Sequence, residues 1–144
     1  MTKIQKVLLT GKTQTKFSRD GEDRLDVRLT TPNNPKSVYA FDAIQAHPTA
    51  EQLFAGAWSA CYLTSLGVAA SLKKVALPAG ASVDVQVDDG QTGTGWFLGA
   101  RFSVRLPGLS RDVAEAIVHS AHQICPYSKA VNGNMEVAVE VVTA

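Results

Sequence analysis

The sequence of 144 residues lacks the features that mark several specialised classes of protein. Its net charge is only +1, and its lysines and arginines are scattered among the acids without forming a basic block. This pattern argues against nucleic acid or an anionic membrane as a partner. The amino terminus has no apolar run long enough for a signal peptide, and no continuous membrane span follows it. We therefore expect a cytoplasmic protein.

Motifs of several common active sites are also missing. The three histidines and two cysteines show neither H-x-x-x-H nor C-x-x-C spacing, which argues against a metal site. No G-x-S-x-G turn is present for a serine nucleophile. The glycines at 90–95 do not join a strand to a helix, as phosphate-binding loops do. We expect neither a metal nor another cofactor.

The dominant feature is an almost entirely apolar stretch, 49–72, which predicts one long helix. Thr49 and Gln52 stand at the spacing of a capping box at its start. A helix that is apolar on all sides has to be covered by the rest of the chain. Cys61 lies within this helix, and a cysteine in such a setting is most often an inert core residue.

The rest of the chain predicts elements that cover this helix. Alternating apolar residues indicate strands, and the Asp-Gly turn at 20–21 places Arg19 near the tip of a first hairpin. The expected elements are strands at 4–17, 24–29, 82–87, 96–106 and 135–141, loops at 31–48 and 88–95, and a second helix from Ser110 to Cys125, where Pro126 stops it. This order predicts a single α+β domain over 1–144, with antiparallel sheets wrapped around a long buried central helix.

Four residues could carry chemistry, and each also has an ordinary explanation. Cys61 and Cys125 could be small core residues, Arg19 a solvated charge, and Glu51 an acid that favours the start of its helix. An acid, a cysteine and a second cysteine followed by Pro-Tyr are nevertheless the expected parts of a thiol catalyst. No competing constellation of residues is present.

These segments resemble a known family. The segment EQLFAGAWSAC at 51–61, the segment HQICPYS at 122–128 and the segment NGN at 132–134 carry the resemblance, together with SRDG at 18–21 and LDVRL at 25–29. They are similar to the organic hydroperoxide resistance (Ohr) branch of the OsmC/Ohr superfamily, over nearly the whole chain.

The resemblance implies an OsmC-like fold, an intertwined homodimer and thiol-dependent reduction of organic hydroperoxides to alcohols. It implies that Cys61 is the peroxidatic cysteine and Cys125 the resolving one, joined as a disulfide during turnover. Arg19 and Glu51 would be the polar pair that activates Cys61. A lipoylated protein or dihydrolipoamide would be the reductant.

Burial and helix geometry constrain these roles. A buried cysteine has a raised pKa, so Cys61 needs a positive charge nearby, and Arg19 is the natural source. Glu51 lies about 15 Å from Cys61 along a straight helix, so Arg19 must bridge them, the helix must kink near Gly56, or the parts come from two chains. Cys125 ends a helix, where the dipole disfavours a thiolate.

The substrate and the alternative function also follow from the residues. Phe54, Trp58 and Tyr62 would form an apolar wall for an organic hydroperoxide. The alternative is a non-enzymatic redox sensor or small-ligand-binding module of the same fold. An enzyme consumes many equivalents of peroxide when a dithiol is present, whereas a sensor reacts once.

Overall fold

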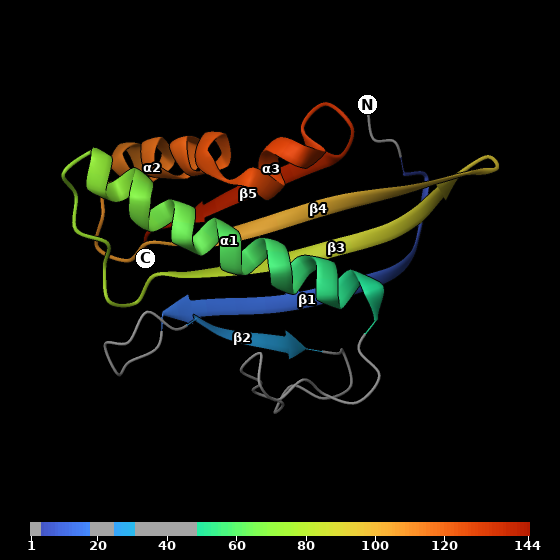
Figure 1. Cartoon of the computed structure of the whole chain (residues 1–144), viewed down its shortest axis with the longest axis horizontal. Coiled ribbons are helices and arrows are strands. Elements are labelled where there is room, and N and C mark those ends of the chain that lie inside the picture. Colours follow the sequence, from blue (N-terminus) through green and yellow to red (C-terminus); the bar gives the residue numbers. More distant parts are fainter. Residues whose placement is uncertain (1–3, 18–24, 31–48) are drawn as a thin grey trace.

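A computed structural model describes residues 4–17, 25–30 and 49–144. It has the α+β architecture expected from the sequence, with helices on one face of a sheet (Figure 1). The elements are β1 (Lys6–Phe17), β2 (Leu25–Thr30), α1 (Ala50–Leu72), β3 (Ser82–Thr92), β4 (Gly95–Arg105), α2 (Arg111–Ile124), α3 (Pro126–Val131) and β5 (Glu136–Val142). The expected turn at 18–21, with Arg19, and the expected loop at 31–48 lie outside the described residues.

The strands form one five-stranded sheet in the order β2-β1-β3-β4-β5. Each neighbouring pair from β2 to β4 is antiparallel, as expected, but β5 pairs with β4 in parallel. A parallel pair needs a long crossover connection, and α2 and α3 provide it between β4 and β5. The expectation of purely antiparallel pairing was therefore wrong at this edge.

The second hairpin is longer than the sequence predicts. The expected loop at 88–95 is instead strand up to Thr92, followed by a turn at 93–94 in which Gly93 has φ +59°. Two contacts explain the extra strand. Asp88 is buried because it pairs with Arg101 and accepts a hydrogen bond from Thr10. Gly90 lets β1 pass closely, since a Cβ there would lie 2.5 Å from the carbonyl oxygen of Lys6.

The start of α1 is fixed by two local features. The capping box is confirmed, because the Thr49 side chain accepts from the Gln52 N–H and the Gln52 side chain accepts from the Thr49 N–H. On the neighbouring strand, Gly11 lies against the first turn of α1, where a Cβ would come within 2.5 Å of the Gln52 nitrogen. The absence of a side chain at Gly11 therefore sets how closely α1 approaches β1.

The core lies between α1 and the sheet, with α2 packed beside α1. Its largest fully buried side chains include Trp58, Tyr62, Leu63 and Leu66 from α1, Val83, Val85 and Val87 from β3, and Ile117 from α2. The Phe102 ring makes edge contacts with both Trp58 and Tyr62, at ring-centroid distances of 4.9 and 5.0 Å. These contacts fix the face that α1 turns towards the sheet.

The opposite face of α1 is partly exposed in the part of the chain that the structure describes. Leu53, Val68 and Leu72 are 43%, 45% and 74% exposed, although the sequence predicts a helix buried on all sides. Of the described elements, the sheet covers one face of this helix and α2 packs beside it. α1 is long and apolar enough to cross a membrane by length and composition, but 56% of its most apolar part is buried, as in the core helix of a globular protein.

Candidate thiol site

Cys61 lies in the middle of α1, on the helix face between the covered and the exposed sides. Its side chain is partly buried and packs against the edge of the core. The neighbouring Tyr62 points inward, where its hydroxyl donates to the Val118 carbonyl oxygen at 3.0 Å. α1 therefore holds the Cys61 sulfur near the surface while the next residue anchors the helix to α2.

Cys125 lies where α2 meets α3 and is fully buried. Pro126 ends α2, as expected, but it also begins α3 at a position where proline costs no hydrogen bond. Cys125 is thus both the C-cap of α2 and the N-cap of α3. The prediction that Cys125 ends a helix is confirmed, and the start of a second, short helix adjoins the same residue.

The two cysteines are in contact, although 64 positions separate them in the sequence. Their Sγ atoms lie 3.5 Å apart, and both thiols are free. A disulfide bond is about 2.05 Å long, so the sulfurs need to move together by only about 1.5 Å. Their exposure differs: a molecule in solution can reach the partly exposed Cys61, whereas Cys125 is covered. The two thiols are therefore placed for a reaction in which Cys61 acts first.

Burial raises the pKa of the Cys61 thiol, and the adjacent Cys125 adds to the rise through a hydrogen bond and charge repulsion. The backbone N–H of Tyr127 acts in the other direction and lowers this pKa, because it donates to the sulfur. The balance among the described residues still favours the neutral thiol. A reactive thiolate at Cys61 therefore needs a positive charge from elsewhere, as the sequence argument expects.

The structure describes only one residue of the expected polar pair, Glu51. Arg19 lies outside the described residues, so its proposed role stays a prediction. Glu51 lies in the first turn of α1. α1 is one continuous helix past Gly56 (Figure 1), so Glu51 and Cys61 remain about 15 Å apart along its axis. Of the three expected solutions, a bridging Arg19 or a second chain remains.

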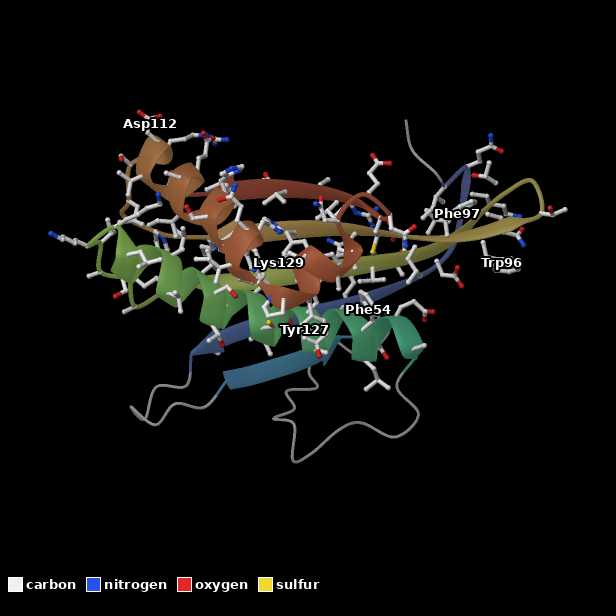
Figure 2. All side chains as sticks on the ribbon, turned by 45° about the horizontal axis from the view of Figure 1, so that its top comes forward. Phe54, Trp96, Phe97, Asp112, Tyr127 and Lys129 are labelled. Atoms are coloured by element: carbon white, nitrogen blue, oxygen red, sulfur yellow. The ribbon has the colours of Figure 1, made fainter. Side chains whose placement is uncertain are left out.

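The expected apolar wall is formed mainly by core residues. Trp58 and Tyr62 are fully buried, whereas Phe54 is partly exposed and meets Trp58 edge to face at 5.8 Å. In Figure 2, α3 lies over α1, and the labelled Tyr127 side chain, 43% exposed, projects along α1. The substrate-binding role of Phe54, Trp58 and Tyr62 stays a prediction.

The chain is similar to known proteins over nearly its whole length. Residues 42–140 match the family described as OsmC-like protein. An organic hydroperoxide resistance protein from Xanthomonas axonopodis pv. citri is 31% identical, over 96% of this chain and 98% of its own. The chain belongs to the OsmC-like family, in its Ohr branch. OhrA of Bacillus subtilis is also 31% identical, over 81% of this chain and 80% of its own.

Solved structures of Ohr proteins have the same fold. OhrB of Bacillus subtilis superposes with a TM-score of 0.63 at 28% identity, covering 92% of this chain and 98% of its own. An organic hydroperoxide resistance protein from Elizabethkingia anophelis gives a TM-score of 0.64 at 26% identity, covering 98% and 100%. The expected OsmC-like fold and the resemblance to the Ohr branch are both confirmed.

In this Ohr-branch chain, sequence reasoning missed two polar residues that lie three positions from Cys125 in the sequence, His122 and Ser128. Ser128 is buried and contacts both the Trp58 indole nitrogen and the His122 ring, at 3.0 and 3.1 Å. Burial, with a smaller effect from His119, lowers the His122 pKa to about 4, so this ring is neutral near pH 7. The spacing of HQICPYS could have indicated that His122 and Ser128 flank Cys125, but their contact with Trp58 depends on tertiary structure.

Proposed function

We propose that this protein is a thiol peroxidase that reduces organic hydroperoxides to alcohols. The observation that carries the proposal is the 3.5 Å separation between a partly exposed Cys61 and a fully buried Cys125. Relatives named organic hydroperoxide resistance proteins, matched over nearly the whole chain, support a role in peroxide detoxification.

The reaction has two steps in which atoms and electrons balance. The Cys61 thiolate attacks the peroxide oxygen, the O–O bond breaks, and protonation of the leaving alkoxide gives the alcohol and a sulfenic acid on Cys61. The Cys125 sulfur then attacks the Cys61 sulfur, forming the disulfide and releasing water. The two cysteines supply the two electrons that the peroxide accepts.

A dithiol returns the enzyme to its reduced state. Thiol–disulfide exchange with a dithiol favours release, because its second sulfur displaces the enzyme thiol from the mixed disulfide. A dihydrolipoyl group, on a lipoylated protein or as dihydrolipoamide, is the reductant proposed here. We place the protein in the cytoplasm, where such dithiols are kept reduced.

A second copy of the chain belongs to this proposal. The exposed side of α1 carries Leu53, Val68 and Leu72, and Cys61 lies at the margin of this apolar strip. A homodimer that covers the strip would bury these side chains and bring a second chain towards the thiol site. Sedimentation analysis tests this part: a dimer supports it, and a monomer at micromolar concentration contradicts it.

The function is tested by steady-state turnover. Purified protein is mixed with dihydrolipoamide and either tert-butyl hydroperoxide or hydrogen peroxide, and peroxide consumption is followed. We expect many turnovers and a higher kcat/KM for the organic substrate, because apolar contact stabilises its alkyl group by roughly 25 cal/mol per Å². Consumption of a single equivalent would favour the redox sensor instead, and equal rates for both peroxides would contradict the substrate assignment.

A further inference from the structure

A hydrogen-bonded cluster, made of Trp58, Ser128 and His122, lies on the helices that adjoin the two cysteines. Trp58 precedes Cys61 by three residues on α1, and His122 precedes Cys125 by three residues on α2. Ser128 follows Cys125 by three residues, on α3. Each member therefore lies about one helical turn from a sulfur, and the cluster joins the three helices that carry the cysteines.

The direction of the hydrogen bonds follows from counting donors. The Trp58 indole N–H donates to Ser128 Oγ at 3.0 Å, and Ser128 Oγ lies 3.1 Å from His122 Nδ1. If Ser128 donates to Nδ1, the N–H at His122 Nε2 is the one polar group of the cluster that lacks a hydrogen-bond partner among the described residues. The reverse direction would leave both the Ser128 hydroxyl hydrogen and Nε2 unpaired. The first arrangement is favoured, since each buried unpaired group is costly.

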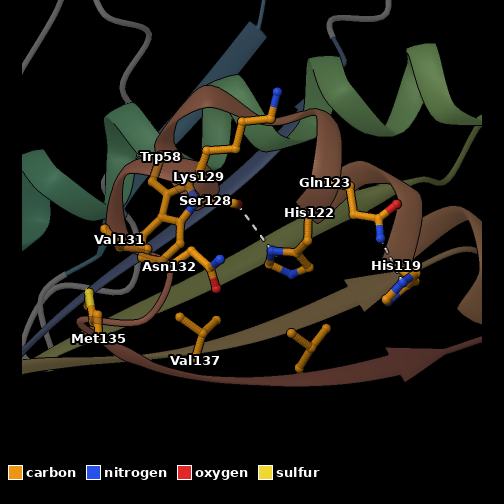
Figure 3. A pocket seen from close by; sticks show the side chains of 11 residues that line it. Trp58, His119, His122, Gln123, Ser128, Lys129, Val131, Asn132, Met135 and Val137 are labelled. Carbon is orange, nitrogen blue, oxygen red and sulfur yellow. Dashed lines mark hydrogen bonds between the residues drawn. The ribbon is translucent and has the colours of Figure 1, made fainter.

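The His122 ring is suited to act as the acceptor. Its pKa is lowered to about 4 by burial, so the ring is neutral and Nδ1 keeps its lone pair. The ring packs on Tyr62 at a centroid distance of 4.4 Å and on Phe102 at 5.3 Å. Figure 3 shows the Ser128–His122 bond next to the Trp58 ring, at the wall of a groove of about 650 Å³. Packing against these two rings therefore holds the acceptor in place.

We propose that Ser128 is a positioning residue for disulfide closure, acting through Trp58 and His122. Without its hydroxyl, the only hydrogen bond shown between the Trp58 indole and α3 is lost, and the segment that carries Cys125 can move relative to α1. A displacement of about 1 Å between reacting groups can cost about a hundredfold in rate. Closure of the Cys61–Cys125 bond depends on this geometry, whereas the attack of Cys61 on peroxide does not. The inference rests on the proposed peroxidase function.

The test separates the two steps in single-turnover experiments. One equivalent of tert-butyl hydroperoxide is added, the sulfenic acid is trapped with a dimedone-type probe, and the disulfide is measured by quenched mass spectrometry. We expect Ser128→Ala to form sulfenic acid within about twofold of the wild-type rate but to close the disulfide about tenfold more slowly or worse. The sulfinic acid fraction should rise under excess peroxide.

Matched variants distinguish positioning from loss of stability. Ser59→Ala removes a buried hydroxyl that lies on α1, outside the cluster, and contacts Thr15 Oγ1 at 2.6 Å. This variant should form the Cys61–Cys125 disulfide at the wild-type rate. His122→Asn keeps a hydrogen-bond acceptor near the position of Nδ1, so its disulfide should form nearly as fast as in the wild type. His122→Leu has no acceptor, so its disulfide should form slowly. Trp58→Phe removes the donor and gives a second slow variant if Ser128→Ala does not fold.

Two results would overturn the inference. One is closure at the wild-type rate in folded Ser128→Ala or Trp58→Phe protein. The other is equal slowing in Ser59→Ala, which would indicate general loosening of the core. These outcomes differ from failure of the proposed function, in which the wild-type protein itself would neither consume peroxide nor form the disulfide.

Discussion

The Sγ atoms of Cys61 and Cys125 lie 3.5 Å apart, although one sulfur comes from the middle of α1 and the other from the junction of α2 and α3. Their surroundings are unequal, because Cys61 is partly exposed and Cys125 is fully buried. The accessible thiol can meet a substrate, and the buried one is held within reach of it. This difference in exposure gives the two cysteines different expected roles.

The first prediction concerns those roles. Cys61→Ser should abolish peroxide consumption, because the buried Cys125 cannot take its place. Cys125→Ser should react once, leave a sulfenic acid on Cys61 that a dimedone-type probe traps, and progress to sulfinic acid under excess peroxide. Sustained turnover by Cys125→Ser with dihydrolipoamide would contradict the resolving role of Cys125.

The second prediction concerns the charge that activates Cys61. Among the described residues, burial and Cys125 raise the pKa of this thiol, so Arg19 should be needed to lower it. Arg19→Ala should raise the Cys61 pKa further and slow the reaction with peroxide, without unfolding the protein. Alkylation of Cys61 followed against pH measures this, with the exposed Arg105→Ala as the control. Superimposable titration curves for Arg19→Ala and the wild type would show that Arg19 does not lower the Cys61 pKa and is only a surface charge.

The third prediction concerns the contact between β1 and α1. A Cβ on Gly11 would lie 2.5 Å from backbone atoms of Glu51 and Gln52, so Gly11→Ala should displace the start of α1. We expect a loss of about 3 kcal/mol in the free energy of unfolding, measured by urea denaturation. Gly80→Ala is the control, because a Cβ there meets only the Pro107 ring at 3.0 Å. Equal stability of the two variants would show that α1 adapts without cost.

The fourth prediction concerns pH. Burial lowers the His122 pKa from 6.5 to about 4 in the folded protein, so the unfolded chain binds a proton at a higher pH than the folded one. The stability from the neutral ring is present above about pH 6.5 and is lost as pH falls towards 4. We expect a loss of about 1–2 kcal/mol, reduced by the partial exposure of the ring.

Variants of the two neighbouring histidines test this assignment. Thermal unfolding between pH 7 and pH 4 should show a shallower decline for His122→Asn than for the wild type. His119→Gln, which changes an exposed histidine, should retain most of the wild-type decline. An unchanged decline in His122→Asn would mean that other groups account for the acid sensitivity.

Local patterns in the sequence predicted most of the fold. The capping box at Thr49, the alternation in β3 and β4 and the extent of α1 depend on neighbouring residues, and all were predicted. The strand from Asp88 to Thr92 was not predicted, because Asp88 is stabilised by partners from neighbouring strands. Arg101 forms an ion pair with its carboxylate, and Thr10 donates a hydrogen bond to it. The parallel pairing of β5 depends in the same way on how the crossover packs.

The candidate site was predicted in part. Cys61 and Cys125 could be singled out from the sequence, and the structure brings them together. The short helix α3, which begins at Pro126, and the hydrogen bonds of Ser128 could not be predicted, because they depend on how α1, α2 and α3 pack. Among the described residues, the sheet covers one face of α1 and leaves Leu53, Val68 and Leu72 exposed.

The most direct test of the peroxidase mechanism is peptide mass spectrometry of the wild-type protein after one equivalent of tert-butyl hydroperoxide. The close approach of the two sulfurs predicts a Cys61–Cys125 disulfide within one chain, formed in stoichiometric yield, and its loss when dihydrolipoamide is added. Two free cysteines, or a bond found only between chains, would contradict the two-cysteine mechanism.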